Sequence, residues 1–109
     1  MKIQNPVDGY FIYTKSNCKY CRIVKKLVPN AKIVNSDEYL KENRDGFLEY
    51  IDKLSGERPR TFPMVFLNNR FIGGYTETKN YIEELESFKF IDFWLLPLAV
   101  RRFHLQLFV

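Results

Sequence analysis

The chain has 109 residues, the length of a single domain, and its hydrophobic (46%) and aromatic (17%) content excludes a disordered chain. The net charge is only +4, and the basic residues lack interleaved exposed aromatic side chains, so nucleic-acid binding is disfavoured. The first fifteen residues contain no apolar run of the signal-peptide type, and we therefore expect a cytoplasmic protein in a reducing compartment.

The first half of the chain predicts strand, helix, strand and helix. Residues 9–14 are aromatic and β-branched, which favours a buried strand. Residues 18–28 predict a helix that ends at Pro29. Residues 31–35 predict a short strand, and residues 43–54 predict a helix preceded by a looser turn. The apolar residues of the first helix recur every three or four positions and are Tyr20, Ile23, Val24, Leu27 and Val28.

The second half predicts a hairpin and a last helix. Residues 62–67 predict a strand that begins at a proline, Asn68-Asn69 a turn, residues 70–72 the partner strand, and residues 76–88 a helix. A βαβ unit followed by ββα is an α/β architecture with a four-stranded mixed sheet and helices on both faces. This is the layout of the thioredoxin fold.

Both cysteines lie in one C-x-x-C motif, Cys18-Lys19-Tyr20-Cys21, at the junction of the first strand and helix. Free N–H groups at a helix N-terminus and lysines such as Lys15 stabilise a thiolate, so we expect a lowered pKa for Cys18 and access to solvent. Cys21 lies one turn later and is expected to be more buried. This asymmetry predicts that Cys18 attacks a disulfide and that Cys21 resolves the mixed disulfide.

A structural zinc site is the competing interpretation of this motif. Such a site takes four ligands, and besides its two cysteines the chain offers one histidine, His104, far away in the sequence. We therefore expect redox chemistry and no metal site.

Two further loops are expected at the same end of the sheet as the cysteines, because ligands of open α/β sheets bind at the carboxyl ends of strands. The first is R-T-F-P at residues 60–63, which enters a strand through a proline. The second is G-G-Y-T-E at residues 73–77, where two glycines allow close approach of a ligand. The helix N-terminus that follows favours a carboxylate.

Together these motifs resemble the glutaredoxin family. They are K-x-x-C-x-Y-C at residues 15–21, R-T-F-P at 60–63 and G-G-Y-T-E at 73–77, in the family's order. The resemblance implies a glutathione-dependent disulfide oxidoreductase, or thiol transferase, that reduces protein disulfides and glutathione mixed disulfides. Glutathione would be its co-substrate, with no tightly bound cofactor.

The resemblance also implies roles for single residues. Cys18 would form the mixed disulfide with glutathione, and Cys21 would resolve it. Phe62, beside a cis Pro63, would bind the cysteinyl backbone. The other glutathione contacts would come from Lys15 and Arg60 at the glycine carboxylate, Tyr20 along the groove, and Gly74, Thr76 and Glu77 at the γ-glutamyl group.

Three departures from the family pattern leave the preferred substrate open. Lys19 stands where proline is common, Phe62 where valine is common, and Glu77 where aspartate is usual. Lys19 also keeps a second function open, in which a dimer carries a [2Fe–2S] cluster between Cys18 of each subunit and two glutathiones.

Residues 1–88 are expected to form the glutaredoxin-like domain, and residues 89–109 an apolar C-terminal extension of unknown role. Its uncharged run, 93–100, is too short for a membrane span. We favour packing of the extension against the domain over a membrane-surface anchor at Arg101 and Arg102 or a dimer contact. The expected partners are glutathione and disulfide-containing or glutathionylated proteins.

Overall fold

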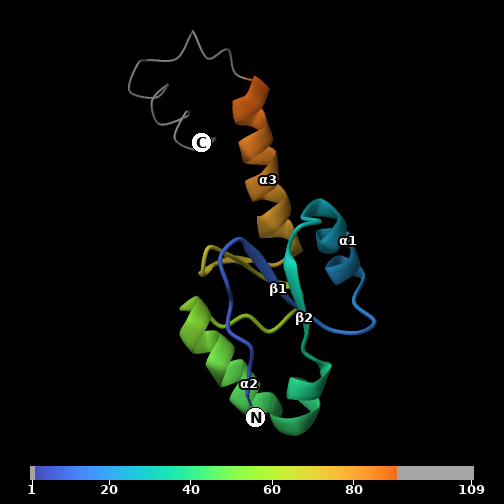
Figure 1. Cartoon of the computed structure of the whole chain (residues 1–109), viewed down its shortest axis with the longest axis vertical. Coiled ribbons are helices and arrows are strands. Elements are labelled where there is room, and N and C mark those ends of the chain that lie inside the picture. Colours follow the sequence, from blue (N-terminus) through green and yellow to red (C-terminus); the bar gives the residue numbers. More distant parts are fainter. Residues whose placement is uncertain (1, 91–109) are drawn as a thin grey trace.

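The computed structural model describes residues 2–90, and within them the chain forms a four-stranded mixed sheet (Figure 1). The strand order is β2-β1-β3-β4. β1 pairs in parallel with β2 across a helical crossover and antiparallel with β3, and β3 pairs antiparallel with β4. The strands are β1 (Tyr10–Thr14), β2 (Lys32–Asn35), β3 (Met64–Leu67) and β4 (Arg70–Gly73).

Helices cover both faces of this sheet, as expected. Successive side chains of β1 point to opposite faces. Phe11 and Tyr13 belong to the core cluster of helix α2 (Asp37–Ser55). Ile12 belongs to a second cluster with residues of α1 (Lys19–Leu27) and α3 (Tyr75–Phe90). The predicted α/β, thioredoxin-like fold is therefore confirmed.

The first core is built around aromatic rings. Phe47 of α2 is fully buried. Its ring lies edge-on to Tyr13 at 5.7 Å between centroids, and it stacks on Tyr39 and Phe62 at 5.4 and 6.3 Å. Because Phe62 precedes β3, this ring chain connects the core with the loop that enters that strand.

Helix α1 differs from the prediction in the residues that it buries. Cys21, Val24 and Val28 are buried, whereas Tyr20 is 49% exposed and Leu27 is 37% exposed. The buried stripe is narrower than the apolar pattern suggested: Val24 and Val28 pack on Ile12 and Val65 of the sheet, whereas the ring of Tyr20 stacks on Tyr75.

Helix α2 begins earlier than predicted. Residues 37–42, expected as a loose turn, are helical, and the helix kinks at Asn43, whose φ and ψ are −157° and 83°. The side-chain oxygen of Asn43 accepts a hydrogen bond from the backbone N–H of Gly46 at 2.9 Å. Asn43 therefore caps the second segment, which is the helix that the sequence predicted.

The predicted hairpin between β3 and β4 is confirmed. Asn68 and Asn69 both have positive φ, 48° and 68°, which is the conformation of the tight turns that suit a right-handed sheet twist. The hairpin places Pro63, directly before β3, and Gly73, the last residue of β4, at the same end of the sheet as the end of β1 that leads to Cys18.

None of the helices in the described part of the chain is both long and apolar enough to cross a membrane. Helix α3 includes the first two residues of the predicted extension at 89–109. The interpretations of that extension, including His104, Arg101 and Arg102, concern residues 91–109, which lie outside the described residues.

We expect Phe47→Ala to lower the free energy of unfolding by about 3–5 kcal/mol, because the cavity would open inside the aromatic core. Urea denaturation of both proteins measures this loss. Leu27→Ala, at a partly exposed position, is the matched control and should lose clearly less. Equal losses in the two variants would contradict the role given to Phe47.

Candidate active site

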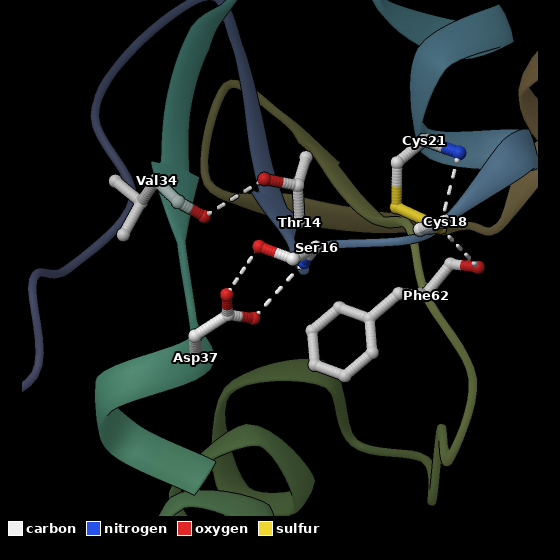
Figure 2. Close-up of a disulfide and its surroundings, with 7 residues drawn as sticks. All are labelled: Thr14, Ser16, Cys18, Cys21, Val34, Asp37 and Phe62. Atoms are coloured by element: carbon white, nitrogen blue, oxygen red, sulfur yellow. Dashed lines mark hydrogen bonds between the residues drawn. A yellow bond between two sulfur atoms is a disulfide. The ribbon is translucent and has the colours of Figure 1, made fainter. Parts of the chain in front are cut away.

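The two cysteines form a disulfide at the N-terminus of α1 (Figure 2). Cys18 is the N-cap residue, and its Sγ accepts a hydrogen bond from the backbone N–H of Cys21 at 3.1 Å. Cys18 is 8% exposed and Cys21 is 2% exposed. The expected order of burial is present, but the expected solvent access of Cys18 is not: in this oxidised state its sulfur lies against the backbone of Cys21 and Phe62.

The loop that enters β3 lies against this disulfide. The Phe62–Pro63 peptide bond is cis, as the resemblance implied. The Cys18 Sγ lies 3.7 Å from the carbonyl oxygen of Phe62 (Figure 2). Two backbone groups therefore lie next to this sulfur, the N–H of Cys21 as a donor and the carbonyl oxygen of Phe62 as an acceptor.

Ser16, two residues before Cys18, is held by the start of α2. Asp37 accepts a hydrogen bond from the Ser16 backbone N–H at 3.0 Å and another from its hydroxyl (Figure 2). These hydrogen bonds keep the pKa of the Asp37 carboxyl below its ordinary value, with a smaller contribution from the charge of Lys15. The sequence did not predict this pair, because Ser16 and Asp37 are 21 positions apart and no local pattern joins them.

Arg60 is bound to α2. Its guanidinium donates two hydrogen bonds to the carboxylate of Asp52, at 2.7 and 2.9 Å. These bonds lower the pKa of Asp52 and raise the pKa of Arg60. Arg60 was predicted to bind a glycine carboxylate, and in this structure Asp52 occupies that binding face of its guanidinium.

Lys15 is exposed beside the cysteines. Its Nζ lies 5.8 Å from the centroid of the Phe62 ring. This arrangement places a cation above the loop that touches Cys18. Of the two residues predicted to bind the glycine carboxylate, Lys15 is the one that remains available.

The double-glycine loop, Gly73-Gly74, connects β4 with α3 at the same end of the sheet as the cysteines. Gly73 has a φ of 136°, which favours glycine. The side chain of Glu77 accepts a hydrogen bond from the backbone N–H of Gly74 at 3.0 Å and so caps the start of α3. Glu77, predicted as a ligand of the γ-glutamyl group, has this structural role in the unliganded loop.

A hollow of about 430 Å³ lies between the two loops and α1. Most of the predicted binding residues line it together, whereas Lys15, Arg60 and Pro63 lie outside its lining. Tyr75, which the sequence analysis did not single out, also lines it. The lining residues are Tyr20, Thr61, Phe62, Gly74, Tyr75, Thr76 and Glu77.

Pro63 is buried and lines a second, smaller hollow of about 210 Å³ with Gly74 and Glu77. Residues 2–90 contain no group of three or more metal-ligating side chains. The site therefore combines three features. They are the Cys18–Cys21 disulfide, the hollow with backbone groups in its lining, and the ammonium group of Lys15.

The two paired carboxylates predict how stability depends on pH. The folded-state pKa values of Asp37 and Asp52 lie below the ordinary value of 3.8. The stability that they add is therefore fully present above that value and is lost as the pH falls through the folded-state pKa. We expect wild type to melt above Asp52→Asn at neutral pH, and the two melting temperatures to converge in acid.

Thermal melts over a pH series measure this convergence. Asp45→Asn, at an exposed position of the same helix, is the matched control and should show a constant, small difference from wild type. A difference for Asp52→Asn that stays the same down to acid would mean that the ion pair does not act on stability.

Comparisons with known proteins agree with this geometry. The sequence model of the glutaredoxin family matches residues 11–72. Human mitochondrial glutaredoxin-2 is 39% identical over 77 residues, which cover 67% of this chain and 44% of that protein. A glutaredoxin of Neisseria meningitidis is 29% identical over 66 residues, which cover 61% of this chain and 75% of that protein. The chain spans less than half the length of the mitochondrial relatives that it matches.

The names of these relatives correct the expectation of a cytoplasmic location. Glutaredoxin-2 of human, mouse and cattle, at 36–39% identity, is mitochondrial. The expectation of a cytoplasmic location is therefore wrong on this comparison. It rested on the absence of an apolar signal run, which bears on secretion and not on other compartments.

Solved structures show the same fold. Glutaredoxin 1 of Francisella tularensis, complexed with cacodylate, superposes with a TM-score of 0.62 at 24% identity, over 72% of this chain and 96% of that chain. A buckwheat glutaredoxin–glutathione complex has a TM-score of 0.58 at 23% identity, over 71% of this chain and 70% of that chain. The family match, the shared fold and the cysteine pair at the N-terminus of α1 lead to one conclusion: this chain belongs to the glutaredoxin family.

Proposed function

We propose that this protein is a glutathione-dependent disulfide oxidoreductase that reduces glutathionylated proteins and protein disulfides. One observation carries the proposal. The Cys18–Cys21 disulfide lies at a helix N-terminus, with the Cys18 Sγ 3.7 Å from the backbone of the cis-proline loop and a hollow beside it. A substrate disulfide that reacts with the Cys18 Sγ has the backbone of Phe62 and the space of the hollow within reach.

The first reaction is the reduction of a mixed disulfide. The Cys18 thiolate attacks the glutathione sulfur of a protein–glutathione disulfide, forms the Cys18–glutathione disulfide and releases the protein as a thiolate, which takes a proton from water. A second glutathione thiolate then attacks that disulfide. The products are oxidised glutathione and the Cys18 thiolate: the sulfur of the second glutathione is oxidised, the protein sulfur is reduced, and no other electron donor is needed.

The second reaction uses both cysteines. Cys18 attacks a protein disulfide, and Cys21 then attacks the resulting mixed disulfide, which releases the reduced protein and leaves the Cys18–Cys21 disulfide. Their Cα atoms are 5.2 Å apart, a usual disulfide separation. Two glutathiones return the pair to the dithiol and leave as oxidised glutathione.

Charges and backbone groups around the hollow support glutathione as the co-substrate. Lys15 offers a free ammonium for one carboxylate. The exposed Thr76 and the first N–H groups of α3 offer donors for the other. Arg60 contributes indirectly in this proposal, because its bond to Asp52 fixes the loop that carries Phe62.

The role as a carrier of a [2Fe–2S] cluster stays a prediction. A visible absorption band in protein purified without oxygen would support it, and the Cys18→Ser variant should then lose the band.

We expect Cys18→Ser to abolish glutathione-dependent reduction, because the remaining thiol, Cys21, is the more buried of the two and has the resolving role in this mechanism. Cys21→Ser should lose reduction of protein disulfides but keep reduction of a glutathionylated peptide, since that reaction needs one cysteine. A coupled assay that follows oxidised glutathione measures both activities.

Near-native glutathione-dependent reduction by Cys18→Ser would rule out the proposed mechanism. Ser16→Ala serves as a check that replacing a neighbouring residue by itself does not abolish turnover, and circular dichroism of each variant confirms that the fold is intact.

A further inference from the structure

A larger hollow, of about 520 Å³, lies at the far end of the sheet from the cysteines. It is bordered by the first residue of β1, the turn of the β3–β4 hairpin, the C-terminal end of α1 and the second half of α3. Cys18 caps the opposite end of α1, a helix of nine residues. This hollow, which we call the distal hollow, is therefore separate from the redox site.

The lining of the distal hollow is mainly apolar. Val28 belongs to the second core cluster and Ile82 packs against it, so the inner wall of the hollow is continuous with the protein interior. Leu27 is 37% exposed, and Tyr81 and Leu85 are partly exposed. Burial of such surface under an apolar group is favourable. The apolar lining residues are Tyr10, Leu27, Val28, Tyr81, Ile82 and Leu85.

The chain continues directly from one wall of the distal hollow. Helix α3 runs past the sheet and ends at Phe90 (Figure 1). Leu85 precedes that end by five residues, which is about 7.5 Å along a helix axis. Four residues of extended chain span up to about 13 Å. The chain after Phe90 is therefore long enough for Trp94 to return to the level of Leu85.

The composition of the segment that follows α3 matches the distal hollow. Residues 93–96 are one phenylalanine, one tryptophan and two leucines, and residues 93–100 carry no charge. Large aromatic side chains bury much apolar surface and pack well against other rings, such as those of Tyr10 and Tyr81. The short connection to α3 also gives this segment a higher effective concentration at the hollow than a separate molecule has.

We propose that residues 93–96, at the start of the C-terminal extension, dock in the distal hollow and complete the second core of the protein. The inference does not depend on the proposed function, because the distal hollow lies away from the cysteines. The family model matches residues 11–72, so this contact belongs to a part of the chain outside the family match.

Trp94 provides the measurement, because it is the one tryptophan of the chain and its fluorescence reports on this segment alone. In the full-length protein we expect emission at a shorter wavelength, and weaker quenching by acrylamide, than in urea-unfolded protein. Leu27→Glu puts a carboxylate into the apolar hollow. It should shift the emission to longer wavelength and raise the quenching constant toward that of the unfolded chain, with circular dichroism unchanged.

Two further variants complete the design. Leu85→Glu changes the α3 side of the hollow and should have the same effect on Trp94, which keeps the test valid if Leu27→Glu folds poorly. Lys26→Glu is the matched control, because it introduces the same side chain at the exposed neighbouring position of α1, outside the lining of the hollow. Its Trp94 emission should equal that of wild type.

The outcomes separate the docked segment from other occupants. Wild-type emission equal to that of the unfolded chain, or emission that neither Leu27→Glu nor Leu85→Glu changes, would overturn the proposal. An equal shift in Lys26→Glu would also overturn it, since the effect would then not come from the hollow.

Two results would assign the segment to another surface and so reject the proposal. A wild-type emission that shifts on dilution, together with a dimer in sedimentation, would point to a second copy of the chain. An emission that moves to shorter wavelength only after addition of anionic phospholipid vesicles would point to a lipid surface. Loss of glutathione-dependent reduction with Trp94 still protected would reject the proposed function alone.

Discussion

Strand β1 carries the active-site loop, and burial on both of its faces sets its position. Phe11 and Tyr13 fill the α2 side, Ile12 fills the α1 and α3 side, and all three are fully buried. Its neighbours on both edges are strands, so its backbone hydrogen bonds are also used. The end of β1 at Thr14 is therefore held in place. The short segment that follows it positions Cys18, the N-cap residue of α1.

Short polar contacts then fix the loops around this point. Asp37 holds Ser16 ahead of the cysteines, and Asp52 holds Arg60 ahead of the cis proline. Both carboxylates belong to α2, so one helix restrains two loops that are far apart in the sequence. Such exposed hydrogen bonds add a modest amount to the free energy of folding. They also tie the segments that carry Ser16 and Arg60 to the same helix.

Aromatic rings connect the interior of the protein with its reactive end. Phe47 lies at the centre of the first core and stacks on Phe62, which contacts Cys18 through its carbonyl group. On the other side of the hollow, Tyr75 joins the second core to the exposed ring of Tyr20. Both cores thus end in side chains that line the same hollow, and the wall of this hollow is an extension of the packed interior.

The sequence by itself determined the order of the elements, the hairpin turn at Asn68-Asn69 and the cysteine pair at a strand–helix junction. These features depend on residues close together in the chain, where periodicity, turn propensity and helix capping act locally. The start of α2 was predicted too late for the same reason, because Asn43 and Gly46 weaken the local helix signal and the kink is stabilised by a cap.

The tertiary structure decided the contacts between distant residues. It paired Arg60 with Asp52 and Ser16 with Asp37, it stacked Tyr75 on Tyr20, and it buried Cys18 in the oxidised state. No local pattern encodes these contacts, since each partner has several other candidates at similar sequence distance. The packing of both helical layers on the sheet selects among them, and that selection determines which predicted ligands remain free to bind a substrate.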